Sequence, residues 1–205
     1  MSAHLYIEGG GNSNEEKIRC RDAFRALLKS QGCFSKRMPR LTACGGRDAA
    51  FDDFQTAHST AKPGHFVGLL IDSEDPLAMP TDPLQQRTWE HLRRRDGWAK
   101  PNGATDQQVL FMTTCMETWI AADRASLRTH YGQELNENQL PPTEQLESRH
   151  RHAVQDALQN ATSNCSNAYR KGKRSYEVLA KLNPAVLADL LPSFARAMAI
   201  LEQNL

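Results

Sequence analysis

Two short apolar runs in this chain stop abruptly at acidic residues. Residues 5–7 are followed by Glu8, and the unbroken apolar run at residues 66–71 is followed by Asp72. A continuous apolar run of this length is typical of a strand in the middle of a parallel sheet, where both faces are buried. If the two runs form neighbouring parallel strands, their acidic ends meet at one edge of the sheet.

The acidic cluster after the second run contains Asp72, Glu74 and Asp75. Closely packed carboxylates repel one another, and a divalent cation bound between them removes the repulsion. We therefore predict that Glu8, Asp72 and either Glu74 or Asp75 hold Mg²⁺ or Mn²⁺, as one ion or two. The alternative is that the cluster is a set of solvated turn residues.

Short apolar runs alternate with amphipathic stretches through the first two thirds of the chain, which predicts an α/β fold with a mostly parallel sheet. We expect four strands flanked by helices, with the strands at residues 4–7, 40–44, 66–71 and 109–112. After two prolines at positions 141 and 142, the composition shifts to helix formers. These patterns predict an α/β domain over residues 1–135 and a helical C-terminal extension over residues 136–205 that packs on the same core.

Helices are expected around and after these strands. The amphipathic stretches lie at residues 13–30, 84–95, 114–131, 147–161, 175–182 and 185–203, with a further helix that carries Phe51 and Phe54. Ser13 is a candidate N-cap for the first helix, and Gly32 is predicted to end it. The helix at 114–131 places Asp123 inside its apolar stripe. A buried aspartate needs a partner, so we expect Asp123 to be structural and paired with an arginine.

The overall composition restricts the classes of partner and compartment. The net charge of +1 gives no global attraction for nucleic acid, so a polyanion would need a local basic patch. No apolar run approaches the about 20 residues that span a bilayer, and the N-terminus opens almost directly into a predicted strand rather than a signal peptide. The five cysteines are widely spaced, which favours reduced thiols. We therefore expect a cytoplasmic protein without membrane association.

A further acidic candidate follows the fourth predicted strand. Glu117 begins the next helix, whose start lies at the carboxyl edge of the sheet, so its side chain is predicted to face the same crevice as Glu8 and Asp72. A first-turn glutamate that is favoured only by the helix dipole explains the residue equally well.

Several basic residues and glycines are candidates for binding a phosphate. Gly9 and Gly10 would let a phosphodiester approach the backbone closely, and Arg47 follows two glycines at a helix start. Arg47 could equally pair with Asp48 or Asp52.

The densest basic run lies at residues 169–174 and contains Arg170, Lys171 and Lys173. A lysine beside a metal site can stabilise charge on a scissile phosphate. A solvated loop is the alternative for this run.

The pattern of Glu8 with its glycines, followed later by Asp72-Ser73-Glu74, resembles the TOPRIM domain, the metal-binding fold of topoisomerases, primases and several nucleases. The sequence departs from the usual pattern at the second acidic position, where Glu74 stands in place of an aspartate. The resemblance implies that similar nucleases recruit an extra helix carboxylate for a second metal, and Glu117 matches that role.

Nearly the whole chain resembles a bacterial family known as domain of unknown function 4276. The motifs that carry this resemblance are Tyr-Ile-Glu-Gly at residues 6–9, Gly-Gly-Arg at 45–47, Leu-Ile-Asp-Ser-Glu-Asp-Pro at 70–76, Cys-Met-Glu-Thr-Trp at 115–119 and Tyr-Arg-Lys-Gly-Lys at 169–173. The resemblance implies similarity to the TOPRIM parts of anti-phage nucleases, including the overcoming-lysogenization-defect family. It also implies a partner ATPase of the ABC or AAA type encoded alongside.

Together these features predict a metal-dependent nuclease that hydrolyses DNA or RNA as the effector of an ATPase-linked anti-phage system. The chain has no Walker motif, so ATP hydrolysis would belong to another chain. The alternative is a non-catalytic, TOPRIM-like module that docks on the ATPase and regulates it. A response-regulator-like domain is a third possibility, which the Glu8-Gly9-Gly10 start fits poorly. The C-terminal helices would either form a homodimer interface or cover the sheet.

Overall fold

The sheet has the predicted parallel architecture. The computed structural model describes residues 2–30, 34, 37–78 and 80–205. Its four strands are β1 (Ser2–Glu8), β2 (Arg40–Gly45), β3 (His65–Asp72) and β4 (Val109–Met112). They form one sheet in the order β2-β1-β3-β4, and every neighbouring pair runs parallel. The predicted α/β fold with a four-stranded sheet flanked by helices is therefore confirmed.

The register brings the acidic strand ends to the same edge. Ile7 of β1 lies opposite Leu70 of β3, so Glu8 and Asp72 are the last residues of two adjacent parallel strands. β1 and β3 are the two central strands of the sheet, and in β3 the residues at 67–71 are all buried, on both faces. This burial explains why the run at residues 66–71 is apolar without alternation.

Helices cover both faces of the sheet. α1 (Asn14–Lys29) belongs to one face, while α2 (Arg47–Ser59) and α3 (Thr88–Asp96) belong to the other. Leu70 faces the core that contains Phe24 of α1. The alternate strand residues Leu69 and Ile71 face the core that contains Phe54 of α2. The period of two along β3 thus divides its side chains between two hydrophobic cores.

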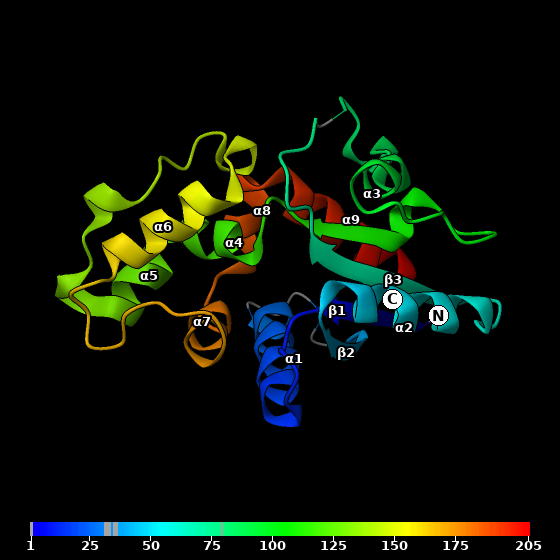
Figure 1. Ribbon diagram of the computed structural model, residues 1–205, viewed down its shortest axis with the longest axis horizontal. Coiled ribbons are helices and arrows are strands. Elements are labelled where there is room, and N and C mark those ends of the chain that lie inside the picture. Colours follow the sequence, from blue (N-terminus) through cyan, green and yellow to red (C-terminus); the bar gives the residue numbers. More distant parts are fainter. Residues whose placement is uncertain (1, 31–33, 35–36, 79) are drawn as a thin grey trace.

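The remaining helices continue the core that α1 begins. They are α4 (Met116–Ala122), α5 (Arg124–Tyr131), α6 (Arg151–Ala161), α7 (Lys173–Leu179), α8 (Pro184–Leu190) and α9 (Pro192–Asn204). Figure 1 shows α4, α5 and α6 at one end of the molecule, with α7 beside α1 and α9 on the sheet. Buried Arg196 of α9 donates hydrogen bonds to the carbonyls of Val109 (2.9 Å) and Asp106 (2.7 Å), which fixes α9 against β4.

The long helix expected at residues 114–131 is two helices, because Asp123 ends α4 and caps α5. The Asp123 carboxylate accepts hydrogen bonds from the amide (3.0 Å) and hydroxyl (2.7 Å) of Ser126 and from the amide of Asn183 (2.8 Å). The structural role was predicted, but the expected arginine partner was wrong. An N-cap aspartate satisfies its charge with backbone N–H groups and needs no ion pair.

Other helix boundaries also differ from the sequence expectation. Pro192 interrupts the helix expected at 185–203, because a proline lacks the N–H that a helix interior requires but fits the first turn of α9. The helix expected at 84–95 begins at Thr88, and the one expected at 147–161 begins at Arg151. Short 3₁₀ turns occupy Pro83–Gln85, Asp106–Gln108, Gly132–Glu134, Glu137–Gln139 and Leu146–Ser148.

Two sequence predictions fall partly outside the described residues. Gly32, the predicted end of the first helix, is not among them, and neither is Cys33. The other four cysteines, Cys20, Cys44, Cys115 and Cys165, are free and buried. In the part of the chain that the structure describes, no helix combines the length and apolarity needed to cross a membrane.

Candidate metal centre

Glu8 reaches from the end of β1 to the neighbouring strand. Its Oε2 accepts hydrogen bonds from the Asp72 amide (3.1 Å) and from Nη1 of Arg47 (3.1 Å). Its other oxygen, Oε1, has no hydrogen-bond partner among the described residues. Burial raises the pKa of the Glu8 carboxyl, and the nearby Arg47 guanidinium offsets this only in part. One oxygen of Glu8 is thus fixed, and the other is free to bind a ligand.

Asp72 ends β3 and presents one free oxygen in the same way. Its Oδ1 accepts a hydrogen bond from the Met116 amide (2.9 Å), while Oδ2 has no hydrogen-bond partner in the described part of the chain. Burial raises the pKa of Asp72 well above its usual value, and the carboxylates of Glu8 and Glu117 raise it further. Lys171 acts in the opposite direction. Burial and two neighbouring carboxylates thus both disfavour the charged form of Asp72 when no cation is bound.

Glu117, in the first turn of α4, is held by residues from the C-terminal part of the chain. Its side chain is almost fully buried, with the residue 2% exposed. The Tyr169 hydroxyl donates to Oε1 at 2.6 Å, and Nε2 of Gln155 donates to Oε2 at 3.2 Å. Nζ of Lys171 lies 3.9 Å from Oε1. A glutamate favoured only by the helix dipole would need no such partners. The buried donors Tyr169 and Gln155 hold Glu117 in a fixed orientation near Asp72.

Gln155 and Tyr169 are functional candidates that the sequence reasoning missed. Gln155 lies on the buried side of α6. A polar residue within an apolar helix stripe needs a buried partner, and this is the signal by which the sequence could have indicated it. Tyr169 stands at the start of the basic run at residues 169–174, but nothing in the sequence links it to Glu117. Burial and the Glu117 carboxylate raise the pKa of Tyr169, so its hydroxyl stays a proton donor.

Arg47 begins α2 and binds the acidic centre rather than pointing into solvent. Its Nη1 donates to Glu8 and to the Asp72 carbonyl (2.6 Å), while Nε and Nη2 bind both oxygens of Asp96 at 3.0 and 2.9 Å. The ring of Trp98 lies 5.2 Å from the guanidinium carbon. The expected partners Asp48 and Asp52 are therefore replaced by Glu8 and Asp96. The guanidinium is already satisfied by protein groups in this structure.

Glu74 and Asp75 face a different set of charges from Asp72. Oε2 of Glu74 forms an ion pair with Arg151 and lies 3.3 Å from Nη2 of Arg95. Oδ2 of Asp75 lies 3.7 Å from Nε of the same arginine, and the Asp75 side chain is 58% exposed. Glu74 has a φ of 69°, and its amide donates to the Thr114 carbonyl at 2.8 Å. The turn at Glu74 divides the acidic cluster into two groups. Glu74 and Asp75 pair with arginines, whereas Asp72 lies beside the carboxylates of Glu8 and Glu117.

Gly9 and Gly10 make close contacts with the protein itself. Gly9 exchanges two backbone hydrogen bonds with Gly45, each 2.8 Å, which tie the ends of β1 and β2 together. Gly10 has a φ of 91°, and its amide donates to the Tyr176 hydroxyl at 2.7 Å. A Cβ atom on Gly10 would lie 2.7 Å from Cα of Lys17. Local packing therefore accounts for Gly10 whether or not a phosphate approaches it.

The basic run is divided by the structure. Lys171 is 65% exposed while its Nζ lies beside Glu117, so this lysine combines proximity to the centre with freedom to move. Lys173 begins α7 and its Nζ lies 3.9 Å from Glu177. Arg170 is exposed and, within the described residues, makes no ion pair. Of the three, Lys171 is the one that the structure brings to the carboxylates.

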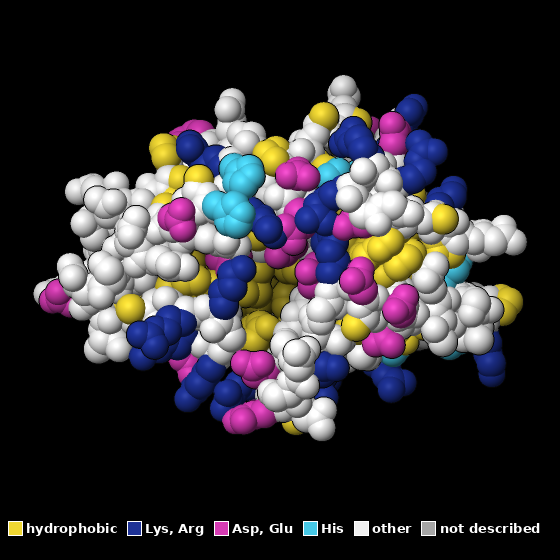
Figure 2. Space-filling view, in the orientation of Figure 1, with side chains coloured by type: hydrophobic (Ala, Val, Ile, Leu, Met, Phe, Trp, Pro, Cys, Tyr) yellow, Lys and Arg dark blue, Asp and Glu magenta, His cyan; other side chains and the backbone are white. Residues whose placement is uncertain are grey.

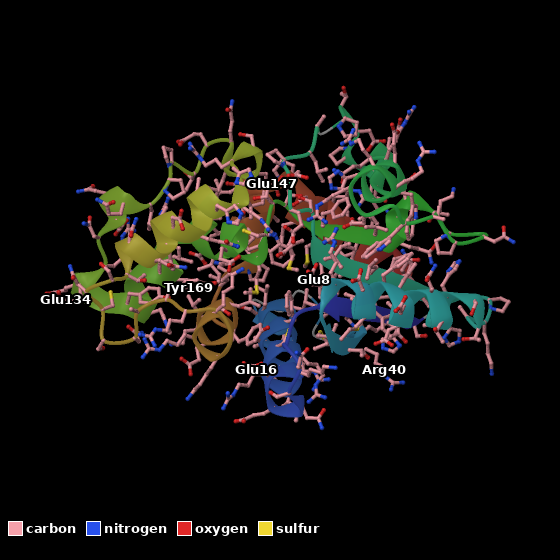
Figure 3. All side chains as sticks on the ribbon, in the orientation of Figure 1. Glu8, Glu16, Arg40, Glu134, Glu147 and Tyr169 are labelled. Atoms are coloured by element: carbon pink, nitrogen blue, oxygen red, sulfur yellow. The ribbon has the colours of Figure 1, made fainter. Side chains whose placement is uncertain are left out.

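The centre lies in a hollow of the molecular surface. Figure 3 places Glu8 near the middle of the molecule, between the sheet and the helical half. Figure 2 shows a hollow there, with hydrophobic side chains at its floor and basic and acidic side chains around its rim. This edge of the sheet therefore lies in a hollow that is open to the surface.

The donor set fits a hard divalent cation that keeps part of its water shell. Across the described ranges, no group of three histidine, cysteine, aspartate or glutamate side chains is positioned to hold a metal ion as it stands. Mg²⁺, however, is usually held by one or two carboxylates, with water and phosphate oxygens completing the octahedron. Glu8 and Asp72 supply two carboxylates, each with one oxygen that has no hydrogen-bond partner among the described residues, and a cation would offset the repulsion that Glu8 and Glu117 exert on Asp72.

Comparison with known proteins places the chain in a family. The family model described as "Domain of unknown function (DUF4276)" matches residues 7–202. The chain belongs to this family. No curated protein matches the chain, and no solved structure matches it. The DUF4276 match includes all three carboxylates of the centre, but it assigns no activity, so the function has to be inferred from the site.

Proposed function

We propose that this DUF4276 protein is a Mg²⁺- or Mn²⁺-dependent nuclease that hydrolyses phosphodiester bonds in DNA or RNA. The observation that carries the proposal is the juxtaposition of Glu8 and Asp72 at the ends of two adjacent parallel strands. Each has one oxygen fixed by the protein and one oxygen free, and Glu117 adds a third carboxylate to the electrostatic environment of Asp72.

The surrounding residues prepare these carboxylates for binding a cation. The Met116 amide holds Oδ1 of Asp72, and Arg47 holds Oε2 of Glu8, so the free oxygens are oriented before any ligand arrives. A Mg²⁺ or Mn²⁺ ion bound there would polarise a phosphate oxygen and lower the pKa of a coordinated water molecule. Lys171, exposed and close to Glu117, is the residue that would bind the phosphate oxygens as negative charge develops.

We also propose a TOPRIM-like relationship and a role as the effector of an ATPase-linked anti-phage system. The placement of Glu8 at the end of β1 and Asp72 at the end of the adjacent β3 supports the relationship. The role in defence rests on the family resemblance. A net charge of +1 supports weak binding of nucleic acid by the chain alone, which suits an effector that an ATPase partner delivers.

Cleavage assays with matched variants test the proposed activity. The purified protein, with and without the proposed ATPase partner, is incubated with DNA, RNA and tRNA in Mg²⁺ and in Mn²⁺. We expect cleavage by the wild type and by Asp75→Asn, and cleavage about a thousandfold slower by Glu8→Gln or Asp72→Asn. Cleavage by Glu8→Gln at the wild-type rate, or by neither protein under any condition, would contradict the proposal.

One observation favours a second candidate function. Arg47, Arg95 and Arg151 already pair with carboxylates at this end of the sheet, as they would in a module that binds no metal. Such a module would dock on the ATPase and regulate it without cleaving nucleic acid. ATPase rates measured with the wild type and with Asp72→Asn distinguish the two: equal regulation by both proteins, without cleavage by either, supports the second candidate.

A further inference from the structure

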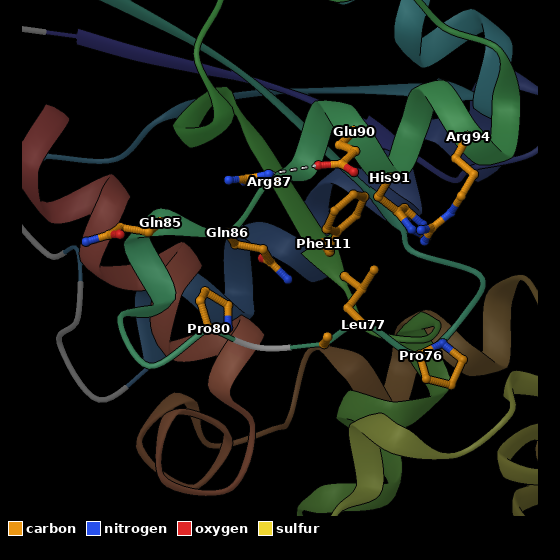
Figure 4. A pocket seen from close by; sticks show the side chains of 11 residues that line it. Pro76, Leu77, Pro80, Gln85, Gln86, Arg87, Glu90, His91, Arg94 and Phe111 are labelled. Carbon is orange, nitrogen blue, oxygen red and sulfur yellow. Dashed lines mark ion pairs between the residues drawn. The ribbon is translucent and has the colours of Figure 1, made fainter.

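A separate cavity of about 340 Å³ lies beside the loop that leaves the metal centre. Figure 4 shows it between α3, the loop after β3 and the outer edge of the sheet. Apolar side chains line much of it, including Pro76, Leu77 and Phe111. Its polar lining includes His91 and Arg94, both from α3. This volume and this mixture of apolar walls with a few polar groups are typical of sites for small organic ligands.

Arg94 supplies the cavity with a positive charge that no carboxylate neutralises. Glu90, which also lines the cavity, is paired with Arg87 at 3.6 Å, as the dashed line in Figure 4 marks. The next arginine, Arg95, is taken by Glu74 and by the Asp96 carboxylate. In the described structure Arg94 forms neither a hydrogen bond nor an ion pair. The cavity therefore favours a ligand that carries an anionic group such as phosphate.

His91 adds a buried hydrogen-bond acceptor. The residue is 5% exposed, and its Nε2 lies 2.9 Å from the carbonyl oxygen of Ser73. A carbonyl only accepts hydrogen bonds, so Nε2 carries the hydrogen and Nδ1 is the acceptor in the neutral ring. Nδ1 is buried and has no partner among the described residues. Burial lowers the pKa of His91, which keeps the ring neutral at pH 7. The partner that Nδ1 lacks is a hydrogen-bond donor.

We propose that this cavity binds a nucleotide. The phosphate would lie on Arg94, the base would pack against Leu77 and Phe111, and a ring or amino N–H of the base would donate to Nδ1 of His91. The ligand would be either a free nucleotide or a nucleotide of a single strand whose phosphodiester lies at the metal centre, because Ser73 joins His91 directly to Asp72. The inference goes beyond the proposed nuclease activity, since binding here requires neither metal nor cleavage.

Calorimetric titration of the full-length protein in EDTA tests the proposal without involving cleavage. The probes are the common nucleoside monophosphates, the matching nucleosides, inorganic phosphate and a five-nucleotide single strand. Arg94→Ala should weaken nucleotide binding about tenfold, the usual loss for one charge-assisted contact. Leu77→Trp, which fills the cavity without changing any charge, should abolish binding. Arg93→Ala is the matched control, because Arg93 is exposed on the same helix but does not line this cavity.

Each outcome supports or overturns the nucleotide site. Binding of a mononucleotide that Arg94→Ala and Leu77→Trp weaken, and Arg93→Ala leaves unchanged, supports a site for free nucleotides. If only the five-nucleotide single strand binds, and Arg94→Ala and Leu77→Trp weaken that binding, the cavity is a site for a nucleotide of the substrate. The proposal is overturned if no probe binds, if phosphate binds as tightly as the nucleotides, or if Arg93→Ala and Arg94→Ala are equally impaired. A cleavage defect would leave these results unaffected, so the two proposals fail independently.

Discussion

Two groups of carboxylates lie at the same end of the sheet, and they differ in how their charge is compensated. Asp72 lies beside Glu8 and Glu117, and its pKa is raised by burial and by both neighbours. Glu74, two residues along the chain, pairs with Arg95 and Arg151. The comparison shows that carboxylates adjacent in the sequence can lie in different electrostatic surroundings. We propose that these surroundings favour a cation at Asp72 rather than at Glu74.

The largest effect on activity is expected from removing the negative charge of Asp72, which lies beside two other carboxylates. Asp72→Asn keeps the acceptor for the Met116 amide but removes the negative charge, so we expect nuclease activity to fall about a thousandfold. Asp75→Asn, which changes an exposed residue of the other group, should retain activity. Cleavage rates at saturating Mg²⁺ measure both, and equal losses in the two variants would remove the distinction between the groups.

Another buried carboxylate, Glu147, extends the comparison to stability. Among the described residues it has neither an arginine nor another carboxylate beside it, and its hydrogen bonds come from the amide (3.1 Å) and hydroxyl of Ser193. Burial raises the pKa of Glu147 from 4.5 to about 7. Between pH 4.5 and about 7 the folded protein retains a proton on Glu147 that the unfolded chain releases. The contribution of Glu147 to the free energy of unfolding therefore falls as the pH rises, by about 3 kcal/mol over the whole interval.

Chemical denaturation at pH 5 and pH 8 measures this change. Glu147→Gln has no titrating group at this position and should lose less stability than the wild type over the same interval. The expected sign would be refuted if the wild type lost no more stability than Glu147→Gln as the pH rose.

The next prediction tests whether Glu117 of α4 contributes to cation binding at the metal centre. Glu117→Gln should raise the Mg²⁺ concentration needed for half-maximal cleavage about 10- to 100-fold, a range typical of groups that support a metal site. Tyr169→Phe removes one donor to Glu117 and should give a smaller shift in the same direction. Thermal denaturation controls for misfolding. An unchanged Mg²⁺ requirement in well-folded Glu117→Gln would limit the centre to the two strand ends.

The smallest effect is expected at Glu74, whose charge is paired with Arg95 and Arg151. Glu74→Gln leaves Arg95 and Arg151 without their shared carboxylate, so we expect the free energy of unfolding to fall by about 1–2 kcal/mol. Cleavage at saturating Mg²⁺ should stay within about threefold of the wild type, because a group outside the reacting centre contributes little to transition-state stabilisation. A large loss of cleavage with little change in stability would show that Glu74 is a ligand.

The sheet could be predicted from the sequence because its signals are local. The apolar run at residues 109–112 coincides with β4, and the Ser13 hydroxyl caps α1 by accepting a hydrogen bond from the Glu16 amide at 3.1 Å. Helix ends were harder, since an aspartate at position 123 fits both a helix interior with a partner and an N-cap. The amide and hydroxyl of Ser126 make Asp123 the cap of α5, and the amide of Asn183, 60 residues further along the chain, occupies its second oxygen.

The carboxylates of the site were predictable, but their partners were not. Parallel strands place Glu8 and Asp72 at one edge from topology alone. The pairing of Arg47 with Asp96 joins residues 49 positions apart, and that of Glu117 with Tyr169 joins residues 52 apart. No periodicity connects such positions. Which acidic residue remains uncompensated therefore depends on tertiary packing and could not be read from the acidic pattern.

The most direct measurement is the anomalous signal of a crystal soaked in Mn²⁺. We predict a peak between the free oxygens of Glu8 and Asp72, and its loss in crystals of Asp72→Asn. A peak bound to Glu74 and Asp75 instead, or no peak at this end of the sheet at millimolar Mn²⁺, would contradict the assignment of the cation to the less compensated carboxylates.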